Sequence, residues 1–92
     1  MIRVGIIGVG YMGRTHCAAY EKCDQVKGVN LLTLPRSRQK AEQLAAQFPK
    51  VLSIEENPDS FFQSDINAID ICTPTPTHEQ FIRRSIQARK AI

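Results

Sequence analysis

The sequence has little that would mark a membrane protein, a secreted disulfide scaffold or a nucleic-acid-binding domain. It contains no apolar run near the roughly 20 residues of a membrane-spanning helix, and Gly8 interrupts the short apolar stretch after Arg3, so no signal peptide is expected. Its three cysteines lack Cys-x-x-Cys or Cys/His ligand spacing, which is typical of reduced thiols in the cytoplasm. The net charge of +3 is spread over scattered basic residues. We therefore expect a cytoplasmic domain without membrane or nucleic-acid partners.

Sets of catalytic side chains are also missing. The sequence contains no Ser/His/Asp arrangement, no pair of carboxylates and no cluster with metal-ligand spacing. His16 is interpreted as a packing or surface residue of a helix. Asp70, between Ile69 and Ile71 in a predicted strand, is expected to have a structural partner rather than a catalytic role. We expect no catalytic residue and no metal site in this chain.

The most informative feature present is the stretch M-I-R-V-G-I-I-G-V-G-Y-M-G at the start of the chain. Residues 2–7 resemble a buried strand, and Gly8, Gly10 and Gly13 then form G-x-G-x-x-G where a helix should begin. Gly8 permits a tight turn, Gly10 lets a diphosphate approach the backbone, and Gly13 allows close helix–strand packing. The helix N-terminus adds unpaired N–H groups and a partial positive charge. The alternative is a Gly-rich turn that binds no ligand.

Strand-like and helix-like segments alternate along the whole sequence. Apolar residues at positions 41, 44, 45 and 48 share one helical face, and Lys27-Gly28 is interpreted as a turn. The predicted strands are residues 2–7, 29–34, 51–54 and 68–73. The predicted helices are residues 11–22, residues 38–48 and a short helix capped by Asn57-Pro58. A last helix is expected to begin at the capping box Thr77-His78-Glu79-Gln80, with Phe81, Ile82 and Ile86 inward. This order predicts one α/β domain of Rossmann type: a doubly wound parallel sheet of about four strands with helices on both faces, truncated before strand five.

The segment after the second predicted strand carries cations where dinucleotide-binding domains commonly carry an acid. It reads L-P-R-S-R at residues 34–38, and no carboxylate occurs from residue 26 to residue 40. An acid here binds the adenosine ribose and repels a 2′-phosphate, whereas forked Arg donors and the Ser37 hydroxyl suit phosphate oxygens. Arg36 and Arg38 also oppose the helix dipole, which an anionic ligand would explain. We expect NADP to be preferred over NAD; the alternative is that both arginines are simply solvated.

A further loop should meet the same edge of the sheet. The sequence T-P-T-P-T-H at residues 73–78 follows the fourth predicted strand, and its prolines prevent continuation of helix or sheet. Because the carboxyl ends of parallel strands share one edge, this loop should lie near the glycine pattern. The hydroxyls of Thr73 and Thr75 suit a ribose or a diphosphate. His78 either bonds the cofactor or simply begins the last helix.

These residues together make the chain resemble the Gfo/Idh/MocA oxidoreductases, the family of glucose–fructose oxidoreductase and inositol dehydrogenase. The similarity covers essentially the whole sequence. It includes V-G-I-I-G-V-G-Y-M-G-R-T-H at residues 4–16, K-A-E-Q-L-A at residues 40–45 and D-I-N-A-I-D-I-C-T-P-T-P-T-H at residues 65–78. The last motif is distinctive, because few other dinucleotide folds pair a Gly-rich start with such a loop.

The resemblance implies a cofactor site and an activity. It implies diphosphate binding by Gly8, Gly10, Tyr11, Met12 and Gly13, recognition of a 2′-phosphate by Arg36 and Ser37 beside Arg38, and contacts with the nicotinamide half from Thr73, Pro74, Thr75 and His78. Pro35 stands where many members carry the ribose-binding acid. The implied activity is hydride transfer between the cofactor and a sugar, cyclitol or related compound. The family's catalytic Lys follows a fifth strand and has no counterpart here, so we expect cofactor binding without catalysis by this chain alone.

A stand-alone module without catalysis is the second hypothesis. A sheet that ends at its fourth strand leaves that strand with an open edge, which favours pairing between chains. The chain would then act as a nucleotide-binding or assembly module. Under either hypothesis we expect a homo-oligomer formed through the edge of the fourth strand.

Overall fold

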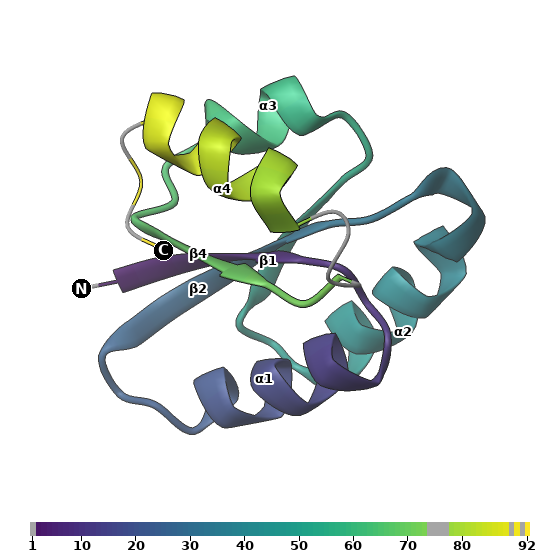
Figure 1. Cartoon of the computed structure of the whole chain (residues 1–92). Helices are drawn as coiled ribbons and strands as arrows, with labels where there is room; N and C mark the ends of the chain where they lie inside the picture. Colours follow the sequence, from purple (N-terminus) through teal and green to yellow (C-terminus); the bar gives the residue numbers. More distant parts are fainter. Residues whose placement is uncertain (1, 74–77, 89, 91) are drawn as a thin grey trace.

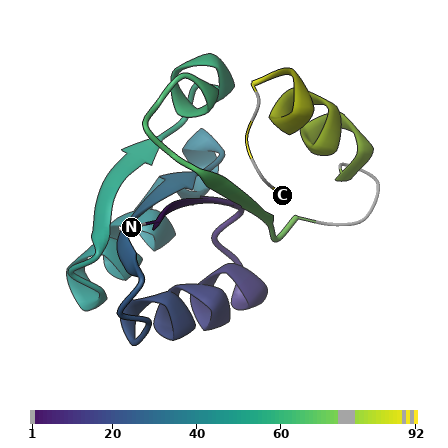
Figure 2. The ribbon, with the colours of Figure 1, turned by 90° about the vertical axis from the view of Figure 1, so that its left-hand side faces the viewer.

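A four-stranded parallel sheet lies between two layers of helices in the computed structural model (Figure 1), which describes residues 2–73, 78–88, 90 and 92. In chain order the elements are β1 (Ile2–Ile7), α1 (Tyr11–Glu21), β2 (Val26–Leu32), the 3-10 turn η1 (Pro35–Ser37), α2 (Arg38–Gln47), β3 (Val51–Glu55), α3 (Pro58–Phe62), β4 (Ala68–Ile71) and α4 (His78–Gln87). Helices α1 and α2 cover one face of the sheet and α3 and α4 cover the other, as the turned view in Figure 2 also shows. The expected doubly wound α/β fold is confirmed.

The strand order is β3-β2-β1-β4, so the order in which strands are added to the sheet reverses at β1. β1 pairs in parallel with β2 on one side and with β4 on the other, and Ile6 therefore lies between Leu31 and Asp70. From β1 the chain builds outward through β2 to β3, and then crosses over to add β4. In sheets of this kind the crevice at the carboxyl ends of the strands, where the order reverses, is the ligand-binding position.

The sheet buries its two faces in two separate apolar clusters. Alternation along β1 sends Val4 and Ile6 to one face and Ile7 to the other. The first cluster lies under α1 and α2 and consists of Val4, Ile6, Val9, Cys17, Val26, Val29, Leu31, Ala41 and Leu44. The second cluster lies under α3 and α4 and consists of Ile7, Leu32, Phe61, Phe62, Ile66 and Ile69. The helices thus bury apolar side chains on both faces of the sheet.

β2 begins earlier than the sequence predicts. Lys27 and Gly28 do not form a turn but join the sheet, where Val26 pairs with Ile2 of β1. The side chain of Leu52 packs on the backbone of Gly28, and a larger residue at position 28 would require this side chain to move. Sheet pairing and packing therefore override the local tendency of glycine to form a turn. The other predicted boundaries lie within two residues of the observed ones.

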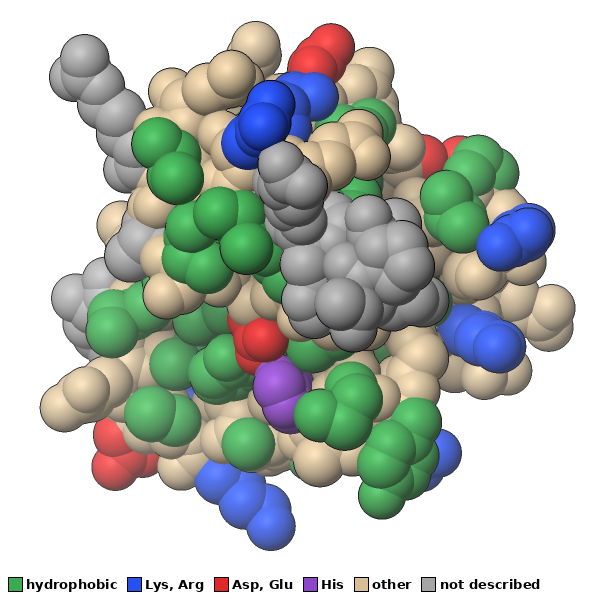
Figure 3. Space-filling model, in the orientation of Figure 1, with side chains coloured by type: hydrophobic (Ala, Val, Ile, Leu, Met, Phe, Trp, Pro, Cys, Tyr) green, Lys and Arg blue, Asp and Glu red, His purple; other side chains and the backbone are tan. Residues whose placement is uncertain are grey.

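α4 presents a different face to the core from the one predicted. Phe81 is half-buried against the second cluster and Ser85 is fully buried, its hydroxyl donating to the Phe81 carbonyl at 2.8 Å. The inward prediction is wrong for Ile82 and Ile86, which are exposed. Ile82 instead borders an apolar hollow beside β4. Hydrophobic side chains gather on the face of the molecule that Figure 3 shows. Thr77 of the predicted capping box lies outside the described residues.

The structure also addresses two expectations drawn from composition, the lack of a membrane-spanning helix and the free state of the cysteines. Among the described residues, no helix combines the length and the apolar character needed to cross a membrane. All three cysteines are free thiols: Cys17 is buried, Cys72 is partly buried and Cys23 is exposed.

Candidate functional site

The loop between β1 and α1 has the geometry that its three glycines predict. Gly8 has a φ of +103°, a conformation that L side chains rarely adopt. A Cβ on Gly13 would collide with the carbonyl oxygen of Gly8, so α1 can pack here only because this residue is glycine. A Cβ on Gly10 would meet no described atom within 4 Å, so packing gives no reason for glycine at this position. The space over Gly10 is what a ligand that approaches the backbone needs.

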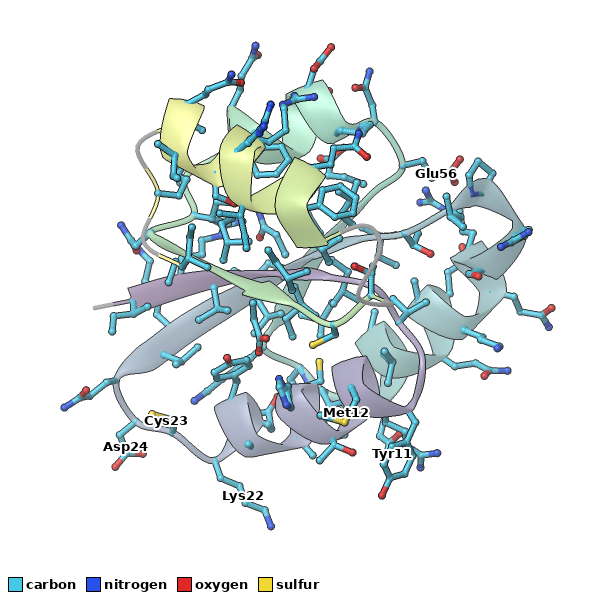
Figure 4. All side chains as sticks on the ribbon, in the orientation of Figure 1. Tyr11, Met12, Lys22, Cys23, Asp24 and Glu56 are labelled. Carbon is cyan, nitrogen blue, oxygen red and sulfur yellow. The ribbon has the colours of Figure 1, made fainter. Side chains whose placement is uncertain are left out.

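The N-terminus of α1 is not capped by a side-chain acceptor. Gly10 precedes the helix in extended conformation and makes no side-chain capping bond, and the first turn contains no acidic residue. Tyr11 and Met12 have 83% and 51% of their surface exposed, and Figure 4 shows Tyr11 projecting away from the sheet. The first-turn N–H groups and the helix dipole thus offer an anion-binding position beside Gly10.

A cleft of about 460 Å³ opens at the carboxyl edge of the sheet and joins the three predicted segments. The glycine loop contributes Gly8 and Gly10, the connection from β2 to α2 contributes Arg36 and Ser37, and the end of β4 contributes Thr73. The complete lining is Ile7, Gly8, Val9, Gly10, Leu32, Thr33, Leu34, Arg36, Ser37, Lys40, Glu56, Pro58, Cys72, Thr73 and Phe81. Residues far apart in the sequence therefore form one mainly apolar groove whose lining also contains polar side chains.

The other predicted site residues stand outside this lining. Tyr11 borders a separate groove between α1 and α2, and the side chain of Met12 is exposed. Gly13 is buried beneath the loop. Pro74 and Thr75 lie outside the described residues, as does the side chain of His78, the first residue of α4.

Arg38 is held by carboxylates of the protein itself. Its Nη1 donates to Oε2 of Glu56 at 2.9 Å, and its Nε lies 3.7 Å from Oε2 of Glu42, one helical turn further along α2. The hydrogen bond to Glu56 is the main cause of a raised pKa for the Arg38 guanidinium. Arg38 does not line the cleft, whereas Glu56 does. The sequence did not single out Glu56, although its position directly after the third strand points to this edge of the sheet.

A polar cluster below the cleft joins α1 to β4. Oδ2 of Asp70 lies 2.6 Å from Nδ1 of His16 and accepts a hydrogen bond of 2.6 Å from the Tyr20 hydroxyl. The Cys72 thiol donates to Oδ1 of Asp70 at 3.4 Å. Asp70 thus has the structural partners that the sequence leads one to expect.

The same cluster has the composition of a metal site, which sequence spacing did not reveal. One ligand atom each from His16, Asp70 and Cys72 lies within 4.8 Å of the others. Burial, followed by the charge of Asp70, raises the pKa of the Cys72 thiol to about 12. Burial and the bond to Asp70 also raise the pKa of Tyr20. The protonated thiol and hydroxyl act here as hydrogen-bond donors to the carboxylate.

The family model for Gfo/Idh/MocA oxidoreductases, described as having an NAD-binding Rossmann fold, matches residues 2–92 of the sequence. The chain belongs to this family. The resemblance inferred from the motifs is therefore confirmed, and the chain is an NAD-binding Rossmann domain of the Gfo/Idh/MocA type.

Several Gfo/Idh/MocA relatives are dehydrogenases of cyclitols and sugars. The chain is 29% identical to the inositol 2-dehydrogenase of Mycolicibacterium gilvum over 92 residues, covering 99% of this chain and 26% of that protein. It is 32% identical over 88 residues to the UDP-N-acetylglucosamine 3-dehydrogenase of Acidithiobacillus ferrooxidans, covering 95% of this chain and 26% of that protein.

A solved Gfo/Idh/MocA structure also contains the dinucleotide. The scyllo-inositol dehydrogenase of Lactobacillus casei, with bound NAD(H) and scyllo-inositol, matches with a TM-score of 0.84 and 26% identity, covering 98% of this chain and 26% of that chain. The chain thus spans about a quarter of the length of the relatives it matches.

Proposed function

We propose that residues 1–92 form the cofactor-binding domain of an NAD(P)-dependent dehydrogenase that acts on a sugar, a cyclitol or a related hydroxyl or carbonyl compound. The observation that carries this proposal is the open space over Gly10 beside the N-terminus of α1, at the end of the cleft. A glycine that packing does not require, placed at a helix N-terminus, suits a diphosphate. The dehydrogenases of inositol and of UDP-N-acetylglucosamine among the relatives support the substrate class.

The bound dinucleotide would extend along the cleft in three parts. We assign the diphosphate to the backbone of Gly8, Gly10, Tyr11, Met12 and Gly13, the adenosine half to the side of Arg36, Ser37 and Arg38, and the nicotinamide half to Thr73, Pro74, Thr75 and His78. The chain itself binds and orients the cofactor, which supplies the hydride chemistry. We expect no turnover from these residues alone.

NADP(H) is the cofactor that we propose to be preferred. Arg36 and Lys40 line the adenosine side of the cleft together with Ser37, and no carboxylate occurs between residues 26 and 40. Two cations and a hydroxyl suit the oxygens of a 2′-phosphate. Arg38 is the least available of the cations, because Glu56 already binds it at 2.9 Å.

Fluorescence titration of the purified chain with NADPH and with NADH tests both proposals. We expect saturable binding of NADPH in the micromolar range and weaker binding of NADH. If neither nucleotide binds below millimolar concentration, the cofactor-binding function is wrong. If NADH binds more tightly than NADPH, the function stands and the preference for NADP is wrong.

A stand-alone assembly module is the second candidate function, and the edge of β4 favours it. In the described part of the sheet β4 pairs with β1 alone. An apolar hollow of about 820 Å³ runs beside it, with Ile71, Ile82 and Ile92 in its lining. Exposed strand edges promote pairing between chains. We propose a homodimer through this edge, whether or not the chain also binds a dinucleotide.

A further inference from the structure

Glu56 is the single carboxylate in the described lining of the cleft. It shares the adenosine side of that lining with Arg36, Ser37 and Lys40. Its side chain is 34% exposed, so solvent and ligands can reach it. In Figure 4 Glu56 lies after β3, beside the turn that leads into α2.

The sheet itself carries Glu56 to this position. Leu32 of β2 is paired with Glu55 of β3, and the Thr33 N–H donates to the Glu55 carbonyl at 2.9 Å. The residue after Glu55 must therefore stand beside the loop at residues 34–38. That loop contains no acid, so a carboxylate from the neighbouring strand occupies the region where a ribose-binding acid would act.

The hydrogen bond from Arg38 orients the Glu56 carboxylate but leaves other acceptor positions on it. Arg38 binds one oxygen, Oε2, at 2.9 Å. An ionised carboxylate has about four acceptor positions on its two oxygens, so acceptors remain for ligand hydroxyl groups. The same negative charge repels a phosphate placed nearby, and this repulsion opposes the attraction from Arg36 and Lys40.

We propose that Glu56 determines cofactor specificity in this cleft: its carboxylate accepts hydrogen bonds from the adenosine ribose of NAD(H) and disfavours the 2′-phosphate of NADP(H). The inference rests on the proposed cofactor-binding function. It assigns opposite preferences to two sides of one site, with cations from the β2–α2 connection favouring NADP(H) and the acid after β3 favouring NAD(H).

Glu56→Gln tests this assignment in the 92-residue chain. The amide keeps the size of the side chain but removes its charge. We expect NADPH to bind more tightly and NADH more weakly, so that the ratio of their dissociation constants moves toward NADPH by about tenfold or more. Glu42→Gln is the matched control, because Glu42 also lies near Arg38 at 3.7 Å but does not line the cleft. Its ratio should stay that of the parent chain.

The Arg38→Gln background separates a direct effect from an indirect one. If Glu56 faces the ribose itself, Glu56→Gln shifts the ratio in Arg38→Gln as it does in the parent chain. A shift that disappears in this background would mean that Glu56 only restrains Arg38, and the proposal would be overturned. An unchanged ratio in Glu56→Gln alone overturns it as well. Glu56→Asp, which retains the charge, provides a second variant and should keep a ratio closer to that of the parent chain.

Failure of the underlying function gives a different result. If the parent chain binds neither nucleotide, the cofactor-binding proposal falls and this inference falls with it. If the parent chain binds both and the variants leave the ratio unchanged, the binding function stands and Glu56 has no part in specificity.

Discussion

Gly10 precedes α1 and Gly13 lies in its first turn, and because their surroundings differ, the same substitution should affect stability to different extents. Gly10→Ala adds a methyl group to open space, so the free energy of unfolding should change by less than about 1 kcal/mol. Gly13→Ala forces a methyl group against the Gly8 carbonyl, and should destabilise the fold by about 1–3 kcal/mol. Urea denaturation followed by circular dichroism measures both values.

Nucleotide titration completes the comparison between the two glycine variants. Folded Gly10→Ala should lose about tenfold or more in affinity for NADPH, because its methyl group occupies the approach to the backbone. A Gly10→Ala chain that folds and binds NADPH like the parent would contradict the placement of the diphosphate over this residue.

The thiols of Cys17, which is buried, and Cys72, which is partly buried, make the stability of the fold sensitive to alkaline pH. Burial raises the pKa of Cys17 from 9.0 to about 11 and that of Cys72 from 9.0 to about 12. Between these values the folded chain retains protons that the unfolded chain releases, so the free energy of unfolding should fall as the pH rises from about 9 to about 12. Urea midpoints measured across this range should show the decline.

Cysteine variants identify the source of this pH dependence. Cys17→Ala combined with Cys72→Ala should flatten the decline, leaving the contribution of Tyr20, whose pKa is also raised. Cys23 is exposed, so Cys23→Ala should leave the slope as it is. A slope that is equally steep in the chain without Cys17 and Cys72 would remove these thiols as its cause.

At the scale of single elements, the short helix α3 depends on its cap. Oδ1 of Asn57 accepts a hydrogen bond from the Asp59 N–H at 2.8 Å, and this helix carries Phe61 and Phe62 into the second cluster. Asn57→Ala should cost about 0.5–2 kcal/mol of unfolding free energy. Asn57→Asp preserves the acceptor and should remain close to the parent. Equal stability of Asn57→Ala and the parent would show that packing alone holds the helix.

Elements with a local cause were predictable from the sequence, and those with a distant cause were not. The cap at Asn57 and the buried strand at residues 2–7 depend on neighbouring residues, and both predictions were confirmed. The start of β2 depends on pairing with β1 and on Leu52 packing against Gly28. The orientation of α4 likewise depends on what lies beneath it, so its helical period could not distinguish Phe81 from Ile82.

The site follows the same division between local and distant causes. The turn at Gly8 and the start of α1 after Gly10 could be predicted because both are coded within a few residues. The Arg38–Glu56 pair and the His16–Asp70 pair join residues 18 and 54 positions apart, and no local pattern indicates them. Both pairs arise where a helix packs beside a strand, α2 beside the end of β3 and α1 beside β4. The sequence predicted that the strands are parallel, but it predicted neither their order nor their register.

At the scale of the whole molecule, the two edges of the sheet differ in what surrounds them, and this makes dimerisation testable. Leu52 on β3 packs against Gly28, whereas β4 borders the 820 Å³ hollow that Ile82 and Ile92 line. Burying this apolar surface against a second copy is favourable, and pairing would satisfy the hydrogen-bonding groups of the open edge of β4.

Light scattering at rising protein concentration should show dimers of the parent chain and monomers of Ile82→Glu. Leu52→Glu places the same charge on the other edge strand and should still dimerise. A parent chain that stays monomeric at high concentration contradicts the proposal, and loss of the dimer in Leu52→Glu alone would move the interface to β3.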